Sequence, residues 1–347
     1  MRARPAPKPD SRLRRGSGRV TMDEVARLAG VSTSTVSRVL REPGAVSDDL
    51  AGKVRSAVDR LGYVPNLMAG GLAAARGRTV GVIVPSILNS FFAGTIDTLS
   101  GLLSSAGWQV LDGSTDYSES REEALVEAFL AWSPAAMVLT GLRHSQRTVR
   151  LLRAARIPVV EMWDVSDGPI DIAVGFSHRE AGRTMTQYLI EKGRRRIVFV
   201  GAIMSSDQRA AQRAEGHREA MTAAGLPVTA IDLPGRSSVA LGGPALADLL
   251  ARQVEMDALY FSNDVLALGA LFECHRRGIA VPSRLSIAGF VDLDFAASCV
   301  PPLTTIRPPR EAIGRETAAI LLARFAGQTH LRRAVDLGFE LQVRRSA

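Results

Sequence analysis

The sequence predicts a small all-helical unit followed by a two-lobed α/β body. Three short stretches between Thr21 and Tyr63 place apolar residues at helical spacing. From Thr79 onward, apolar runs alternate with amphipathic helical patterns, which is typical of parallel sheets covered by helices on both faces. This second part spans nearly 270 residues, which is large for one such sheet. We therefore expect two similar lobes with a cleft between them.

The positive charge of the chain is concentrated at its amino-terminal end. Residues 1–78 contain fifteen Lys or Arg and seven Asp or Glu, whereas residues 79–347 contain 28 of each sign. A neutral body with a basic head points to a polyanionic partner, although a basic tail is often only solvated. Residues 1–19 are rich in Arg, Pro and Ser, and we expect them to be a disordered basic tail.

The rest of the composition is that of a globular protein. Hydrophobic residues make up 46% of the chain and charged residues 22%. Its two cysteines, Cys274 and Cys299, cannot form a disulfide framework, so we expect free thiols in a reducing compartment. No stretch approaches the roughly 18 consecutive apolar residues of a membrane span, and no signal peptide is recognisable. A cytoplasmic protein without a membrane partner is expected.

The first two predicted helices form a helix-turn-helix. The first opens with a capping-box pattern at Thr21 and Glu24, and Gly30 suits the tight turn that follows it. Ser32 is the predicted cap of the second helix, and Ser47 that of the third. The residues that we expect to face inward are Val25, Leu28, Ala29, Val36, Val39, Leu40, Leu50, Val54, Val58 and Leu61. Two short helices joined by such a turn are the geometry that places a helix in the major groove of DNA.

The outward face of the second helix suits contact with DNA. Thr33, Ser34 and Ser37 carry short hydroxyl side chains, and Arg38 is basic. Such a face can approach a groove, form hydrogen bonds with base edges and bind phosphate. The alternative is an ordinary solvated helix face.

The body is predicted to contain eight strands separated by helices. The strands are Val80–Val84, Gln109–Leu111, Ala136–Leu139, Pro158–Val160, Ile172–Val174, Ile197–Val200, Ala258–Phe261 and Ser286–Ala288. Helical patterns lie near residues 90–106, 119–131, 178–191, 208–224, 240–252, 263–277 and 310–326. We place the domain boundaries at 1–19 for the tail, 20–65 for the head, 66–78 for a hinge and linker, and 79–342 for the body.

Several long motifs resemble one family of bacterial repressors. The runs TMDEVARLAGVSTSTVSRVL and VRSAVDRLGYVPNLMAGGLA resemble the DNA-binding head of the LacI/GalR family. The resemblance continues through GVIVPS, VGFSHREAGR, FSNDVLALGA and PPLTTI, and so covers nearly all of residues 20–342. Within the family, VPSILNSFF, DIAVGF and DLGF are most similar to the gluconate-repressor branch. The resemblance implies a transcriptional repressor with a helix-turn-helix head, a hinge helix and a two-lobed body like that of type I periplasmic binding proteins.

For the head, the resemblance implies a set of DNA contacts. By position, Thr33 and Ser34 match the family's base-reading pair, and Arg38 matches a basic residue one turn further along. The residues that we expect at the DNA are Thr21, Ser32, Thr33, Ser34, Ser37, Arg38, Tyr63, Asn66, Ala69 and Leu72. The last four match the hinge helix, in which Leu72 from each subunit would act as a wedge in the minor groove. For Leu72 alone, an ordinary buried linker residue is the alternative.

For the body, the resemblance implies a small effector between the lobes, near the carboxyl ends of the strands. The candidates at such ends are Ser86, Arg143, His144, Asn263, Asp264, Asp292 and Asp294. Asn263 matches a family contact, and Arg213 lies three residues before Gly216, where relatives place a ligand-binding Arg. Val291 stands where relatives have an Asp, so Asp292 or Asp294 is expected to replace it. Arg143 and His144 are equally compatible with solvated loop residues.

A sugar acid such as gluconate is the expected effector, because Arg can hold a carboxylate bidentately. A neutral sugar, or a purine acting as co-repressor, is the alternative; the sequence does not place Phe91, Phe92, Trp132 and Trp163 together as a purine site would require. Whether the effector induces or co-represses depends on which lobe arrangement it prefers.

Other classes of protein fit less well. The chain contains no P-loop, G-x-S-x-G, HExxH or CxxC motif, and its five His are scattered, so neither an enzyme nor a metal site or other cofactor is expected. A solute receptor would need a signal peptide and no DNA-binding head. We expect a homodimer on a near-palindromic operator, because one recognition helix reads too few base pairs. The leucine-heptad tail that makes some relatives tetrameric is not found after the last strand.

Overall fold

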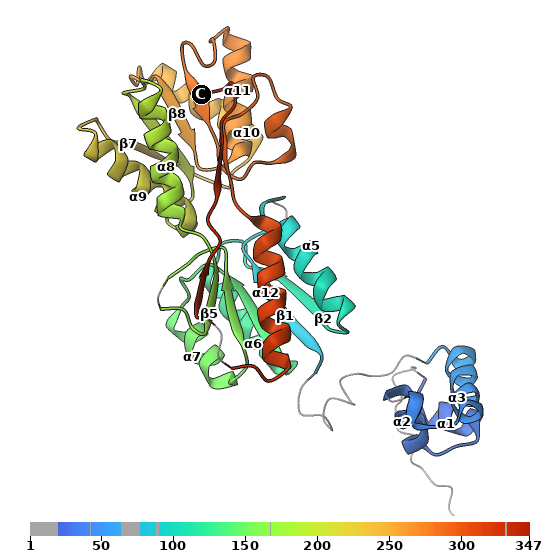
Figure 1. Cartoon of the computed structure of the whole chain (residues 1–347). Coiled ribbons are helices and arrows are strands. Elements are labelled where there is room, and N and C mark those ends of the chain that lie inside the picture. The colour runs from blue at the N-terminus through green and yellow to red at the C-terminus, as the bar shows by residue number, and fades with distance from the viewer. Residues whose placement is uncertain (1–19, 42, 64–76, 88–89, 167, 330–331) are drawn as a thin grey trace, which may run out of the picture. The chain divides into compact units, whose positions relative to one another are not determined.

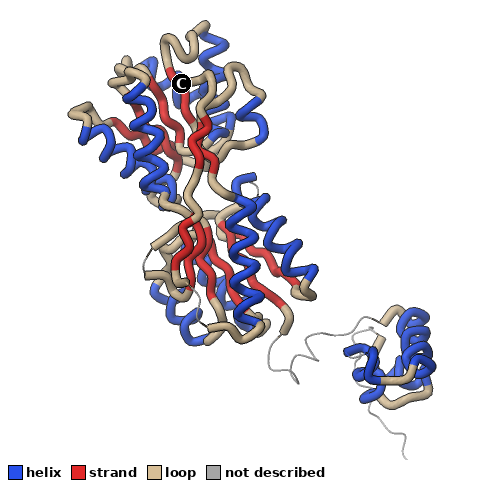
Figure 2. Tube along the Cα trace, in the orientation of Figure 1, coloured by secondary structure: helices blue, strands red, loops and turns tan. Residues whose placement is uncertain are grey.

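The computed structural model describes residues 20–41, 43–63, 77–87, 90–166, 168–329 and 332–347. Contacts divide the chain into two compact units, Met1–Ala75 and Arg76–Ala347. We call them the head and the body (Figures 1 and 2). Among the described residues, no helix is long and apolar enough to cross a membrane.

The head contains the three expected helices, α1 (Met22–Ala29), α2 (Thr33–Arg41) and α3 (Asp48–Leu61), with a 3-10 turn η1 (Pro43–Ala45) between the last two. The capping box at Thr21 is confirmed, since Thr21 and Glu24 exchange backbone and side-chain hydrogen bonds. Gly30 has a φ of +68°, the left-handed conformation that favours glycine at a helix end.

The core of the head is formed by one face of each helix. Val25, Val36 and Val54 are at most 2% exposed and pack together with partly buried neighbours. The expectation that Leu28 is buried was wrong, since 42% of this residue is exposed. The buried residues of α1 are Val25 and Ala26, and Leu28 lies on the other side of Val25 from Ala26, at the edge of the buried face.

The body has two lobes, each built around one parallel sheet. We call the lobe that contains β1 the N-lobe and the other the C-lobe. The sheet of the N-lobe has six strands in the order β11-β5-β4-β3-β1-β2. Its strands are β1 (Thr79–Val84), β2 (Gln109–Ser114), β3 (Ala136–Thr140), β4 (Val159–Met162), β5 (Ile172–Gly175) and β11 (Ala334–Asp336). Its helices are α5 (Ser90–Ser105), α6 (Glu119–Ala131), α7 (Gln146–Ala155) and α12 (Arg310–Phe325). Both faces are covered: Val82 of β1 lies in one core cluster with residues of α5 and α12, and Ile83 in another with residues of α6 and α7.

The C-lobe contains a four-stranded parallel sheet in the order β7-β6-β8-β9. Its strands are β6 (Ile197–Ala202), β7 (Thr229–Leu233), β8 (Ala258–Phe261) and β9 (Ser286–Ala288), with the 3-10 turn η2 (Asp294–Ala297) after them. Its helices are α8 (His178–Glu191), α9 (Gln208–Ala223), α10 (Val239–Ala251) and α11 (Asp264–Arg277). A small antiparallel pair, β10 (Thr305–Arg307) with β12 (Glu340–Gln342), lies beside this sheet.

The chain passes between the lobes three times (Figure 1). It leaves the N-lobe after β5, returns after β10 to form α12 and β11, and crosses again before β12. The last residues pack in the C-lobe, where Ser346 is fully buried and its hydroxyl donates to the carbonyl of Ile287.

Two pairs of C-lobe helices pack with their backbones in contact. Gly182 of α8 lies against the backbone of Arg213 on α9, and Gly216 of α9 lies against the backbone of Arg179 on α8. Gly242 of α10 and Gly269 of α11 repeat the arrangement. A side chain at any of these positions would separate the two helices, so glycine allows the close approach. The close contact between α8 and α9 therefore fixes the position of Arg213 on α9.

Candidate DNA-binding surface and effector site

The α2 helix of the head presents one apolar and one polar face. Val36 and Val39 are buried, whereas Ser34 and Arg38 are exposed and Thr33 and Ser37 are half-buried. The α2 helix therefore offers hydroxyl groups and the guanidinium of Arg38 to a partner, in the arrangement that a recognition helix needs.

The other candidates in the head have structural partners or lie elsewhere. Ser32 caps α2 by accepting from the backbone N–H of Thr35 at 3.2 Å, and the Thr21 hydroxyl takes part in the capping box of α1. Tyr63 belongs to the core of the head, with 8% exposed. The hinge candidates Asn66, Ala69 and Leu72 lie outside the described residues.

Arg213 of α9 lies at the junction of the two lobes and is 4% exposed. Its Nη1 donates to Nδ1 of His178 at 2.8 Å and its Nη2 to the carbonyl of Ser262 at 2.9 Å, while the guanidinium lies 3.9 Å from the centroid of the Phe290 ring. Its buried Nε has no hydrogen-bond partner among the described residues. No described carboxylate forms an ion pair with it: its direct contacts are neutral, and the charge of Asp207, which pairs with Arg209, acts on it only from a longer distance.

A second arginine, Arg209, lies one turn earlier on α9 and was missed from the sequence. It is 9% exposed, its guanidinium lies 5.6 Å from the Phe92 ring of the N-lobe, and Asp207 is 3.5 Å away. A Cβ at Gly141, just after β3, would lie 3.0 Å from its Nη1. The spacing of four residues from Arg213 is the signal that could have revealed it, since such residues share a helix face.

Asp164 is a further residue that the sequence reasoning missed. It follows β4, is 4% exposed, and accepts from Nε2 of Gln212 on α9 at 3.0 Å. Burial raises the pKa of this carboxyl, despite the hydrogen bond from Gln212. The side-chain oxygen of Gln212 is buried without a partner among the described residues. The same strand-end rule that selected Ser86 could have selected Asp164.

Among the predicted candidates, Ser86 and Asn263 are buried at strand ends, each 4% exposed. The amide of Asn263 caps α11 by accepting from Leu266 N–H at 3.2 Å, and donates to the Ser237 hydroxyl at 2.6 Å. Its polar atoms are therefore held in a fixed orientation.

The three candidate carboxylates have different surroundings. Asp264 is fully buried and accepts from the Thr305 hydroxyl at 2.7 Å and Leu293 N–H at 2.8 Å; burial raises its pKa to about 7. Burial also acts to raise the pKa of Asp292, but ion pairs with Arg307 and Arg344 hold it below its usual value. Asp294 is exposed at the start of η2.

The two candidates after β3, Arg143 and His144, differ in burial. Arg143 is exposed. The His144 ring is 1% exposed, with Glu122 2.7 Å from Nδ1 and Glu161 3.4 Å from Nε2. Burial acts to lower the pKa of His144, but the two glutamates outweigh it and raise the pKa to about 9. Both ring nitrogens are thus engaged by the protein.

The interpretation that Phe91, Phe92, Trp132 and Trp163 do not cluster at strand ends was wrong for Phe92 and Trp163. Trp163 directly follows β4, its ring lies 5.0 Å from Phe92 and 6.3 Å from Phe176, and it is 2% exposed. Helical and strand patterns along the sequence do not show which ring packs on which. Trp132, by contrast, is 53% exposed at the end of α6.

Backbone strain also gathers at these strand ends. Trp163, Ile203 and Val291 follow β4, β6 and β9 closely, and their φ angles are +72°, +46° and +113°. Such angles are costly for residues with bulky side chains and occur most often where function requires a particular geometry.

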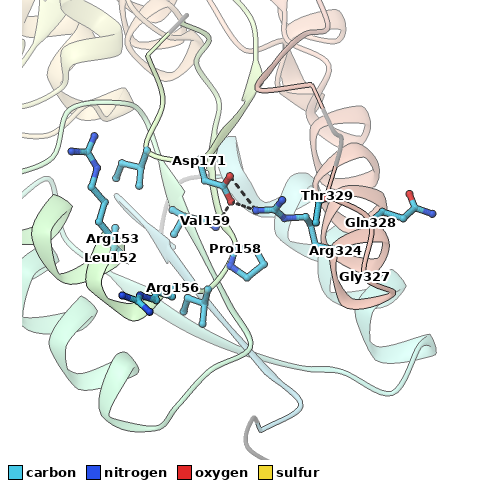
Figure 3. A pocket seen from close by; sticks show the side chains of 12 residues that line it. Leu152, Arg153, Arg156, Pro158, Val159, Asp171, Arg324, Gly327, Gln328 and Thr329 are labelled. Atoms are coloured by element: carbon cyan, nitrogen blue, oxygen red, sulfur yellow. Dashed lines mark hydrogen bonds and ion pairs between the residues drawn. The ribbon is translucent and has the colours of Figure 1, made fainter.

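A cavity of about 460 Å³ lies at the opposite end of the N-lobe sheet (Figure 3). It is near the amino ends of β4 and β5, where Arg324 donates to Asp171 at 2.9 and 3.2 Å. None of the predicted effector residues lines it. At the carboxyl ends of the strands, the lobes instead contact each other through Arg209 and Gln212.

Comparison with known proteins agrees with both parts of this arrangement. A model described as bacterial regulatory proteins of the lacI family matches residues 21–66, and one described as a periplasmic binding protein-like domain matches residues 186–347. The HTH-type transcriptional regulator GntR of Pseudomonas aeruginosa is 44% identical over 334 residues, covering 96% of this chain and 97% of that protein. This chain belongs to the LacI family of bacterial regulatory proteins.

Solved structures of LacI-family proteins have the same fold. A LacI-family regulator from Silicibacter pomeroyi superposes with a TM-score of 0.89 at 36% identity, covering 94% of this chain and 99% of that one. The lac repressor dimer, solved with its operator and an anti-inducer, has a TM-score of 0.81 at 25% identity, covering 94% and 99%. The expected fold class is confirmed, and the chain is a DNA-binding transcription regulator rather than an enzyme. LacI-family regulators bind operator DNA and small-molecule effectors, and dimers are typical of them.

Proposed function

We propose that this LacI-family regulator represses genes of sugar-acid catabolism and is controlled by an aldonate such as gluconate bound between its lobes. Arg213 is the observation that carries the proposal. A buried guanidinium without a counter-ion costs several kcal/mol, and an anionic ligand would remove that cost. Two of the five guanidinium N–H groups have protein acceptors, which leaves three to hold a carboxylate.

The neighbouring side chains suit the hydroxyl groups of a sugar acid. Asp164 and Asn263 at strand ends and Gln212 on α9 offer acceptors and donors. The Gln212 oxygen and Trp163 Nε1 have no hydrogen-bond partner among the described residues and could bind a ligand. Arg209 adds a second positive charge beside them. An uncharged sugar would leave Arg213 without a counter-ion, so we favour the acid.

A purine is the alternative that one observation supports. Phe92, Trp163 and Phe176 form an aromatic cluster at the same strand ends. The rings meet edge to face and are buried against one another, so they must separate before a base could stack between them. This cost makes a purine the weaker candidate.

In the head, we propose that Ser34 and Arg38 reach base edges or phosphates from the exposed face of α2, with Thr33 and Ser37 beside them. A homodimer would place two such helices in successive major grooves of a near-palindromic operator. We place this activity in the cytoplasm, where operator DNA is. The hinge contacts of Asn66, Ala69 and Leu72 remain part of this proposal.

Isothermal titration calorimetry of the full chain with gluconate, gluconolactone, glucose and a purine tests the effector. Gluconate is expected to bind, and glucose much more weakly. Arg213→Ala should abolish the response of the operator complex to gluconate while leaving operator affinity near normal. Arg213→Lys should restore only part of the response, because Lys keeps the charge but not the planar fork. If glucose binds as well as gluconate, the carboxylate contact is wrong; if only the purine binds, the sugar-acid proposal fails.

A further inference from the structure

His178 is a buried histidine at the point where the chain leaves the N-lobe. It is the first residue of α8, and 1% of it is exposed. Its ring centroid lies 4.5 Å from that of Phe176 and 5.6 Å from that of Phe290. The imidazole is therefore held in place by two aromatic rings, one from each side of the lobe junction.

Both nitrogens of this ring make short hydrogen bonds to groups with fixed roles. The ring Nε2 lies 2.8 Å from the carbonyl oxygen of Trp163, and Nδ1 lies 2.8 Å from Nη1 of Arg213. A carbonyl can only accept and a guanidinium can only donate. The ring must therefore carry its hydrogen on Nε2 and offer the lone pair of Nδ1 to Arg213, which makes His178 neutral.

The electrostatic surroundings agree with a neutral ring. Burial, and then the positive charges of Arg213 and Arg209, lower the pKa of His178 well below its usual value. Around Arg213, the other described partners are the Ser262 carbonyl and the Phe290 ring, which are also neutral.

A carboxylate in the place of His178 would orient Arg213 equally well, but it would neutralise the guanidinium before any ligand arrived. A neutral acceptor orients the side chain and leaves its charge uncompensated. We propose that His178 is a positioning residue for effector binding, which aims the Arg213 guanidinium while preserving its full positive charge for an anionic effector. This inference rests on the proposed function, because it assumes that the effector carries an acid group.

His178 also ties this arrangement to both lobes. Trp163 belongs to the N-lobe and Arg213 to the C-lobe, so the ring fixes the guanidinium relative to the strand ends of both. The backbone at Gly182, one turn after His178 on the same face of α8, packs on the backbone of Arg213. Side chain and main chain of Arg213 are therefore both held by α8.

Three variants of the full chain separate orientation from charge, with gluconate as the probe in calorimetry. The Asn in His178→Asn can offer a neutral acceptor near the position of Nδ1, and His178→Asp offers an anionic acceptor of almost the same shape. The Gln in His178→Gln can still donate to the Trp163 carbonyl but offers Arg213 no matched acceptor. We expect His178→Asn to bind gluconate within about threefold of the unmodified chain, and the other two to bind at least tenfold more weakly. Melting temperatures of all three should be measured alongside, as a check of folding.

Equal affinities of the Asn and Asp variants would overturn the role of charge, and equal losses in all three would reduce His178 to a packing residue. A second measurement needs no variant to fold: long-range ¹H–¹⁵N spectra of the unmodified, effector-free protein at pH 7 should show a neutral His178 with its hydrogen on Nε2. An imidazolium or an Nδ1–H ring would refute the assignment. Failure of the unmodified chain to bind gluconate would instead count against the proposed function, and the spectrum would then decide the role of His178 by itself.

Discussion

Replacing Gly182 by alanine tests whether the crossing of α8 and α9 determines the position of Arg213. A Cβ at residue 182 would lie 2.8 Å from both the carbonyl carbon and the Cα of Arg213, and closer still to the carbonyl oxygen. Ordinary contacts begin at 3.4 Å, so α9 must retreat by at least about 0.6 Å. The atoms in the way are backbone atoms, which cannot rotate aside.

Two effects of opposite sign contribute to the stability of Gly182→Ala. Overpacking costs about 1–3 kcal/mol, and replacing a helical Gly by Ala returns up to about 1 kcal/mol. Since the clash involves two helix backbones, we expect a net loss of about 1–2 kcal/mol. The retreat of α9 would also lengthen the 2.8 Å bond between Arg213 and His178. Losing such a bond to a charged group, at about 1.5–3 kcal/mol, would weaken gluconate binding roughly 10- to 100-fold.

Urea denaturation followed by circular dichroism measures the first effect, and calorimetry with gluconate the second. Gly101→Ala on α5 is the matched control, because a Cβ at that position meets nothing within 4 Å. This control should be as stable as the unmodified chain or slightly more so. A Gly182→Ala protein with an unchanged urea midpoint and unchanged affinity would show that the close crossing does not position Arg213.

Three further predictions concern other parts of the molecule. Arg38→Ala should weaken operator binding by about 1–3 kcal/mol in a gel-shift assay if Arg38 contacts a base, and a uniform loss on all sequences would point to phosphate instead. Arg209→Met removes the charge of residue 209 but keeps most of the contact of its side chain with Phe92, and we expect it to reduce gluconate affinity in calorimetry. An unchanged affinity would show that Arg209 does not belong to the site. His144 has a pKa of about 9 in the folded protein, above its ordinary 6.5. Its contribution to stability, at most about 3 kcal/mol, is therefore full below pH 6.5 and lost as the pH rises through 9. The urea midpoint of the unmodified chain should accordingly fall toward the midpoint of His144→Gln as the pH rises from 6.5 to 9.5. A difference between the two midpoints that stays constant over this range would contradict the raised pKa.

The elements that could be predicted from the sequence are those with strong periodicity or long apolar runs. All three head helices and the strands β1 to β6, β8 and β9 fall in this group. The β2 and β7 strands are both edge strands without a fully buried residue. The sequence of β2 still has the adjacent apolar residues Val110 and Leu111, whereas in β7 Asp232 separates Ile231 from Leu233, and β7 was missed. The β10, β11 and β12 strands have three residues each, too few for a pattern. The α7 helix was missed because its charged face outweighs its two buried positions, Thr148 and Leu152.

The candidate site was predicted in outline, because parallel strands bring their carboxyl ends to one edge of a sheet. Which side chains contact one another within the site could not be predicted, because these contacts join segments that are distant in the sequence. Arg213 and His178 are 35 residues apart and meet only once α8 and α9 cross. The packing of Phe92 on Trp163 likewise depends on how α5 lies over the sheet.

The three passages between the lobes have a consequence for exchanging parts among relatives. Neither lobe is one continuous stretch of sequence, because α12 and β11 return to the N-lobe after the C-lobe has been formed. The periplasmic binding protein-like region that matches this chain, residues 186–347, therefore contains most of one lobe together with a helix and a strand of the other. If a chimera joined two relatives at a single point before the C-lobe, to bring in a new effector specificity, it would also replace β11, the edge strand beside β5 in the N-lobe sheet. Chimeras of LacI-family regulators should fold best when a junction is placed at each of the three passages, so that the donor supplies β12 with its C-lobe while its α12 and β11 are left out.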